Sequence, residues 1–140
     1  MKRLLPIFLS VLLITAVLIP SLCFTIAEDY FEPPVVIEEY SLTSGIAASL
    51  SISGGTAHVA GAVSAKYANA HCSVTVKLQK KSSDGSWHSI KTWTSSGTLA
   101  ASAGGDYSVS SGSYRTCVLG TVTYNGNSEH PVKYSGTKTY

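Results

Sequence analysis

The sequence predicts an all-β protein, a single antiparallel β-sandwich of about six to eight strands that follows an N-terminal signal helix. Apolar and polar residues alternate between turn-forming residues through most of the chain, which is typical of half-buried strands. Beyond residues 1–27, no segment keeps the 3.6-residue period of an amphipathic helix. Ser, Thr and Gly make up 43 of residues 41–140, a composition that excludes coiled coils and helix bundles.

Residues 1–27 have the organisation of a secretory signal peptide. Two basic residues precede a 16-residue apolar run, Leu4–Ile19, and small residues follow it. We expect cleavage after Ala27, or alternatively after Cys23, and therefore a secreted, extracellular protein with no stable membrane span. A retained anchor is disfavoured because the run is shorter than the ~20 residues that cross a bilayer core. Lipid attachment at Cys23 is disfavoured because Leu22 is too large for the position before an acylated cysteine.

The next segment, residues 28–40, is an acidic, Pro-containing arm or an edge strand through Val35–Ile37. It carries a net charge of −5, whereas residues 41–140 carry +5. Removal of residues 1–27 leaves a chain with no net charge, so the overall +2 does not indicate a nucleic-acid partner.

The β domain is expected over residues 41–140, with turns at Asp84–Gly85 and Asn125–Gly126. Period-two alternation indicates that the apolar residues of each strand share one buried face. Strands are expected at Ile46–Ile52, Ala57–Val63, Cys72–Leu78, Trp87–Thr94 and Thr116–Tyr124, and another begins at Tyr107–Val109. Thr98–Ser102 is a weak candidate strand, and Val132–Tyr134 and Thr137–Tyr140 are candidates that can close the sheet.

Cysteine usage fits an exported protein. Loss of Cys23 with the signal peptide leaves Cys72 and Cys117, and an even pair in a secreted domain favours a disulfide. That disulfide would close a loop of about 45 residues and contribute ~3–4 kcal/mol. The alternative is two separate buried thiols.

Several short segments resemble small secreted proteins of Gram-positive, clostridia-type bacteria, from families of unknown function with immunoglobulin-like or fibronectin-III-like sandwiches. The matching residues are Leu78–Lys81, Asp84–Trp87, Gly112–Arg115, Glu129 and Ser135–Lys138. The resemblance covers roughly residues 42–140 and implies an immunoglobulin-like fold in an extracellular setting, without catalytic residues. It also implies that Trp87 and Tyr114 anchor the core. Tyr114 precedes Cys117 by three residues, so either a bulge intervenes or the cysteines do not form the central bridge of antibody domains.

Catalytic and metal-binding patterns are missing from the sequence. After residue 40 the carboxylates are limited to Asp84, Asp106 and Glu129, too few to suggest a glycosidase pair. There is no Gly-x-Ser-x-Gly motif. We therefore predict no enzyme, no cofactor and no metal site. The histidines lack ligand spacing and stand far apart, at His58, His71, His88 and His130.

Binding at or outside the cell surface is the function that the sequence favours. The chain has more aromatic residues than a small core needs, and exposed aromatic rings stack on sugars or anchor protein interfaces. The expected partner is a cell-wall polymer, glycan or surface protein, and the alternatives are a secreted antagonistic toxin, self-assembly through Val35–Ile37, or a hydrolase with an unconventional site. A solvated sheet edge also explains the lysines. The candidate binding residues are Trp93, Tyr107, Tyr124, Tyr134, Lys80 and Lys81.

Overall fold

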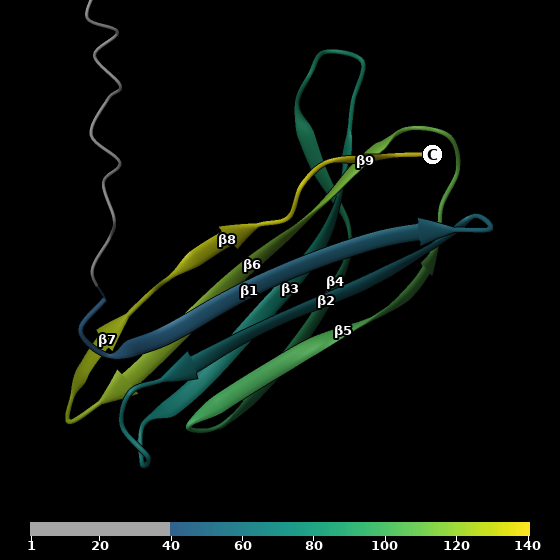
Figure 1. The fold of residues 1–140 in the computed structure, drawn as a ribbon. Coiled ribbons are helices and arrows are strands. Elements are labelled where there is room, and N and C mark those ends of the chain that lie inside the picture. The colour runs from purple at the N-terminus through teal and green to yellow at the C-terminus, as the bar shows by residue number, and fades with distance from the viewer. Residues whose placement is uncertain (1–39) are drawn as a thin grey trace, which may run out of the picture. The chain divides into compact units, whose positions relative to one another are not determined.

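The computed structural model describes residues 40–140, and the predicted signal peptide and residues 28–39 of the arm lie outside this range. Nine strands follow one another in the described part of the chain, with tight turns between most of them (Figure 1). They are β1 (Thr43–Ser53), β2 (Thr56–Ala65), β3 (His71–Lys81), β4 (Trp87–Thr98), β5 (Ala100–Ser108), β6 (Ser113–Tyr124), β7 (Asn127–Glu129), β8 (Val132–Tyr134) and β9 (Lys138–Thr139).

Two antiparallel sheets pack face to face, which confirms the predicted all-β antiparallel sandwich. The smaller sheet has the order β1-β2-β5 and crosses in front of the larger one in Figure 1. The larger, six-stranded sheet has the order β4-β3-β6-β7, and β8 and β9 also pair with β6. The nine strands of the described residues exceed the six to eight expected. β8 and β9 lie at the expected Val132–Tyr134 and Thr137–Tyr140, whereas β7, which also pairs with β6, was not expected.

The buried faces are those that the alternation predicted. Leu50 and Val63 of the smaller sheet and Val76 and Val118 of the larger one are at most 7% exposed. The sheets approach most closely at Gly61, where an added Cβ would lie 2.5 Å from a Val118 methyl carbon and 2.6 Å from one of Val76. Glycine is therefore required there by packing rather than by backbone conformation.

The register of β4 against β3 changes at Ile90, which is an extra residue on β4. On one side of this bulge Trp93 lies opposite the buried Val76, and on the other Trp87 lies opposite the exposed Lys81. The two tryptophans would share a face in a regular strand, and the bulge puts them on opposite faces. The core role implied for Trp87 is therefore wrong, and Trp93 is the tryptophan that packs against the core.

The segment rich in Ser, Gly and Ala forms one continuous strand, β5, in place of the two short strands expected at Thr98–Ser102 and Tyr107–Val109. Small residues suit this strand because the Trp93 ring lies against it. A Cβ added at Gly105 would come within 2.8 Å of Trp93 Nε1. A bulky partner on the facing sheet thus offsets the weak strand propensity of the segment.

Tyr114 anchors the core, as the resemblance implied. Its side chain is 1% exposed, and its hydroxyl donates a 2.6 Å hydrogen bond to the backbone carbonyl of Ser110. A Tyr hydroxyl bonded a few residues upstream near the start of a late strand fixes the preceding corner of a sandwich.

Cys72 and Cys117 are both buried and unpaired, so the predicted disulfide is wrong. Cys72 pairs with Val122 across β3 and β6, whereas Cys117 pairs with Lys77. The two cysteines are thus offset by five positions, roughly 16 Å along the sheet, and their side chains point to opposite faces. A disulfide needs Cα atoms within about 7 Å. β6 keeps a regular register through Cys117, so no bulge brings its side chain inward.

Glu129 of β7 fastens the start of β1 to the larger sheet. Its Oε1 accepts hydrogen bonds from the Ser41 N–H, the Ser41 hydroxyl and the Leu42 N–H at 2.6 to 2.9 Å. Its Oε2 accepts from the Thr43 N–H and hydroxyl, both at 2.9 Å. Partial burial raises the pKa of this carboxyl, but the hydrogen bonds from Ser41, Leu42 and Thr43 outweigh it and lower the pKa to about 2.

Candidate functional site

Aromatic and basic side chains gather on the outer face of the larger sheet. The guanidinium carbon of Arg115 lies 4.4 Å from the ring centre of Trp87 and 4.3 Å from that of Tyr134, so two rings flank one cation. Arg115 Nε donates a 2.8 Å hydrogen bond to Gln79 Oε1, and Lys81 Nζ lies 5.9 Å from the Trp87 ring centre. We call Gln79, Lys81, Trp87, Arg115 and Tyr134 the Arg115 cluster.

Strand register brings the Arg115 cluster together from four strands. Arg115 of β6 lies directly opposite Gln79 of β3, and Lys81 at the end of β3 lies opposite Trp87 at the start of β4. Tyr134 of β8 lies opposite Cys117, one outward-facing position along β6 from Arg115. The β-bulge in β4 is essential, since it turns Trp87 outward.

The Arg115 cluster is positively charged and has no neutralising carboxylate within residues 40–140. The salt bridge in this part of the chain joins His58 to Asp106 on the other sheet, and no Lys or Arg side chain takes part in one. Arg115 is half-buried, whereas Tyr134 is 48% exposed. The rings hold the guanidinium in one position, which lowers the entropic cost of binding an anion.

Three of the predicted binding aromatics do not reach the Arg115 cluster. Trp93 and Tyr107 are half-buried and pack against the core, so each presents an edge at most. Tyr124 stacks on Tyr67 with ring centres 4.3 Å apart and planes 4° from parallel, at the opposite end of β6. Tyr134 lies in the cluster and is well exposed.

The two predicted binding lysines are separated although they are adjacent in sequence. Lys80 extends over the buried Tyr114 ring at 5.4 Å and donates a 2.9 Å hydrogen bond to the Ser110 hydroxyl. Lys81 belongs to the Arg115 cluster and is exposed. The alternation of β3 explains the division, because successive side chains point to opposite faces.

Arg115, Gln79 and Trp87 were not predicted from the sequence as binding residues. Arg115 stood in a segment interpreted only as structural, and Trp87 was given a core role. The odd parity that Arg115 shares with Cys117 on β6 was the available signal for an outward arginine. Its meeting with Trp87 depends on the bulge at Ile90, for which the sequence gives no clear pattern.

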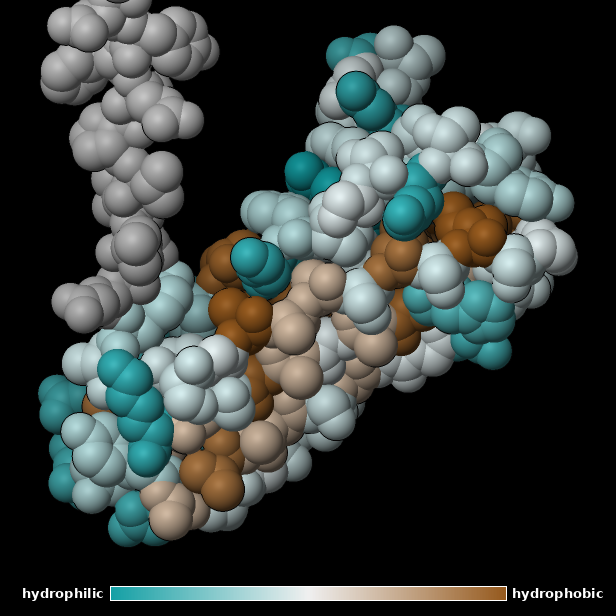
Figure 2. Space-filling view, in the orientation of Figure 1, coloured by the Kyte–Doolittle hydropathy of each residue, from teal (hydrophilic) through white to brown (hydrophobic). Residues whose placement is uncertain are grey.

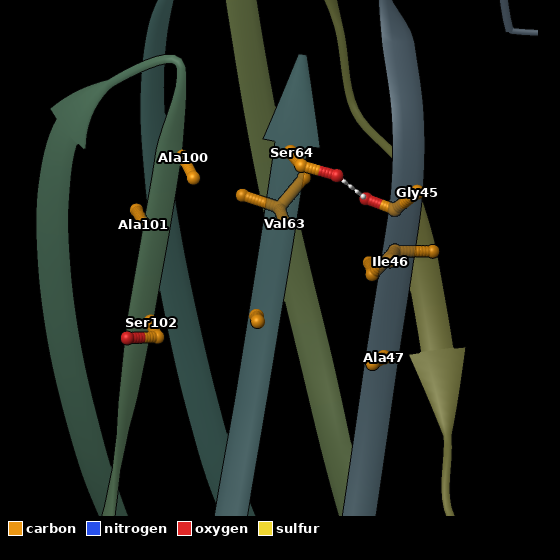
Figure 3. Close-up of a pocket in the computed structure, with 9 residues that line it drawn as sticks. Gly45, Ile46, Ala47, Val63, Ser64, Ala100, Ala101 and Ser102 are labelled. Carbon is orange, nitrogen blue, oxygen red and sulfur yellow. Dashed lines mark hydrogen bonds between the residues drawn. The ribbon is translucent and has the colours of Figure 1, made fainter.

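The outer face of the smaller sheet is different, since apart from His58 and Asp106 it consists of small residues. Figure 2 shows it as a pale band of weakly hydrophobic residues over β1, β2 and β5. Two shallow depressions of about 370 and 530 Å³ adjoin one another along this band. Figure 3 shows the first, where Gly45 and Ala47 of β1, Ser64 of β2, and Ala100 and Ser102 of β5 line the surface.

Neither a metal site nor a membrane-spanning helix is present in the described range. No group of three or more His, Cys, Asp or Glu residues is placed to hold a metal ion within residues 40–140. In the same residues, no helix is long and apolar enough to cross a bilayer.

Comparison with known proteins adds little to this picture. No protein-family model matches the sequence, and no curated protein matches it either. Among solved structures, the crystal structure of a protein from Archaeoglobus fulgidus is similar over 70% of this chain and 97% of that chain. The two are 11% identical with a TM-score of 0.33, values that support no inference about function.

Proposed function

We propose that the protein is exported and binds an anionic polymer at or outside the cell surface through the Arg115 cluster. The observation that supports this most directly is the position of Arg115 between the rings of Trp87 and Tyr134, with no carboxylate partner in the described chain. Predicted secretion and the net charge of +5 on residues 41–140 are consistent with such a partner.

The chemistry of the Arg115 cluster suits a polymer that carries phosphate or carboxylate groups on a sugar backbone. Nε of Arg115 donates its hydrogen bond to Gln79, which orients the guanidinium and leaves the two terminal nitrogens without a hydrogen bond to residues 40–140. Those nitrogens can bind an anion through two parallel hydrogen bonds. Tyr134 offers an exposed ring for stacking on a sugar, and Lys81 adds a second cation.

We further propose that the fold is immunoglobulin-like and that the chain resembles the small secreted clostridia-type proteins noted above. The hydrogen bond from the Tyr114 hydroxyl to Ser110 supports the first proposal, because this corner is a hallmark of such sandwiches. The signal-like residues 1–27 support the second.

The test is co-sedimentation of the purified protein with bacterial cell walls, with the same walls after extraction of their anionic polymers, and with mucin. Arg115→Gln removes the central charge and should weaken binding at least about tenfold, since hydrogen bonds to charged groups contribute about 1.5–3 kcal/mol. Lys138→Gln is the matched control, because it removes one charge from an exposed residue of β9 outside the cluster.

Saturable pelleting that falls with Arg115→Gln but not with Lys138→Gln supports the proposal. Equal loss in both variants indicates diffuse charge attraction without a site. No pelleting with any wall or with mucin overturns surface binding and favours the alternative of a freely diffusing antagonist, to be tested on living cells.

A further inference from the structure

A Ser-His-Asp hydrogen-bonded chain lies on the outer face of the smaller sheet, on the side of the sandwich away from the Arg115 cluster. The Ser53 hydroxyl, at the end of β1, lies 3.1 Å from Nε2 of His58 on β2. Nδ1 of the same ring lies 2.7 Å from Oδ1 of Asp106 on β5. The order of atoms is that of a nucleophile, a base and the carboxylate that orients the base.

Turn geometry and strand register create this arrangement. The two-residue turn Gly54–Gly55, with φ of 54° and 75°, brings β2 back alongside β1. Ser53 and His58 become diagonal neighbours on one face, and Asp106 lies directly opposite His58 in the next strand. Within residues 40–140, the N–H groups of Gly54 and Gly55, which follow Ser53 in the chain, donate no backbone hydrogen bond outside the strand ladders.

A second Ser, His and Asp lie close together in the β3–β4 hairpin, and their connectivity is different. There Ser86 is in the middle, because its hydroxyl donates to Asp84 at 2.6 Å and also lies 2.9 Å from His88 Nε2. The Asp84 carboxylate accepts its hydrogen bond from the serine hydroxyl and makes none with the histidine. The Ser86 cluster closes a turn, and its serine can be compared with Ser53 in the same protein.

The shallow depressions on the same face lead toward His58. Ala62 and Ser102 face each other along the second depression, followed by Ala60 and Gly104, and the next outward pair on these strands is His58 and Asp106. Small side chains leave a shallow, weakly apolar groove that can take an extended aliphatic chain.

We propose that Ser53, His58 and Asp106 form a hydrolytic site for carboxylic esters whose acyl chain lies along this groove. With the Nδ1 hydrogen donated to Asp106, Nε2 carries the lone pair that accepts the proton of Ser53. Ser53 Oγ bonds to the ester carbonyl carbon while its proton moves to His58. The tetrahedral intermediate then expels the alcohol, which takes the proton from His58.

Hydrolysis of the acyl enzyme completes the cycle. Water attacks the acyl carbon while His58 accepts its proton, and the carboxylic acid departs as Ser53 regains its hydrogen. The net reaction converts ester and water to acid and alcohol. The backbone N–H groups beside Ser53 can stabilise the oxyanion of both intermediates. His58 and Asp106 are 44% and 67% exposed at their side chains, so we expect slow turnover of unhindered esters.

The first test is covalent labelling of the purified protein with a fluorophosphonate, in which Ser53 Oγ displaces fluoride from phosphorus. Tryptic digestion separates the candidate serines, because Ser53 lies in the peptide ending at Lys66 and Ser86 in the peptide 82–91. We expect the adduct on Ser53. His58→Ala should lower the labelling rate at least about 100-fold, the usual contribution of a general base. Asp106→Asn should lower it by a smaller factor.

Matched controls are Ser108→Ala, an exposed serine on the outer face of β5 that lines neither depression, and Ser86→Ala in the hairpin cluster. Both control variants should be labelled at the wild-type rate. In a separate assay, the wild-type protein should hydrolyse p-nitrophenyl octanoate faster than p-nitrophenyl acetate. An adduct on another serine, a labelling rate unchanged by His58→Ala, or no adduct would overturn the proposal. Such an outcome would leave the prediction that the protein is not an enzyme standing.

Discussion

Replacing Glu129 with Gln tests how the beginning of β1 is held to the larger sheet. The carboxylate accepts hydrogen bonds only, with Oε1 facing Ser41 and Leu42 and Oε2 facing Thr43. A glutamine amide keeps one acceptor oxygen and puts an NH₂ donor at the other position, where it meets N–H and O–H donors. Either orientation of the amide therefore loses hydrogen bonds and leaves buried or half-buried donors without a partner.

The magnitude follows from the pKa of Glu129. A folded-state pKa of about 2, against 4.5 for the free side chain, corresponds to about 3 kcal/mol of stabilisation at neutral pH. Glu129 is partly exposed, and screening by water reduces this to about 2 kcal/mol. For a domain of this size such a loss lowers the melting temperature by about 10 °C.

The pH dependence gives a second, independent readout. Because the pKa of Glu129 is lower in the folded state, its contribution is complete above about pH 5 and is lost as the pH falls from about 4.5 to about 2. Urea unfolding between pH 7 and pH 2.5 should show this decline in the wild type and a much smaller one in Glu129→Gln. Asp84→Asn is the control, because hydrogen bonds from Ser86 lower the pKa of this fully exposed turn residue without linking the sheets. Equal stability of Glu129→Gln and wild type at pH 7, with the same decline in acid, would refute the reasoning.

Two further predictions concern the core. Gly61→Ala places a Cβ 2.5 Å from a Val118 methyl carbon and should lower the free energy of unfolding in urea by about 1–3 kcal/mol. The control is Gly45→Ala, whose added Cβ lies 3.4 Å from the Ser64 hydroxyl and should change stability little. Similar effects of the two substitutions would contradict the close approach at Gly61. Cys72 and Cys117 are both buried, and burial also raises the pKa of the Cys72 thiol. A thiol reagent should therefore modify the two cysteines only after the protein is unfolded, and no reductant should be needed. If either cysteine fails to react in the unfolded protein, it is oxidised or paired.

Alternation predicted the inner faces of the sandwich because one period-two pattern decides which side of a strand is buried. The residues Leu50, Val63, Val76 and Val118 are buried as that pattern requires. The same alternation places Cys117 on the outer face with Arg115, which argues against a disulfide to Cys72. The disulfide was predicted because the even number of cysteines was given more weight than this alternation. Parity was the better guide, since it reflects backbone geometry.

Features that depend on two distant strands could not be predicted in this way. The bulge at Ile90 turns Trp87 outward and Trp93 inward, and one inserted residue changes the face of every side chain beyond it. The continuous β5 depends on the Trp93 ring that covers Gly105, a contact between sheets. Local sequence carries neither piece of information, so the Arg115 cluster became visible only in three dimensions.

Ser53 and His58 were within reach of a sequence argument, because a two-residue turn at Gly54–Gly55 fixes the register of the hairpin. Residues five apart across such a turn become diagonal neighbours on one face, so the proximity of Ser53 and His58 could have been predicted from the sequence. Asp106 was not, since the pairing of β5 with β2 depends on a chain crossing from the larger sheet at Leu99. Neighbours within a hairpin can be inferred from local sequence, whereas the position of Asp106 beside His58 depends on the tertiary fold.

The two proposed sites lie on the outer faces of two packed sheets, and those faces point away from each other. Arg115 and Ser53 share no hydrogen-bond partner, and the core of the sandwich separates them. Mutations at sites with no common contacts act independently, so Arg115→Gln should leave Ser53 labelling unchanged and Ser53→Ala should leave wall binding unchanged. Each variant therefore serves as the folding control for the other experiment. Loss of both activities in one variant would point to unfolding rather than to either site.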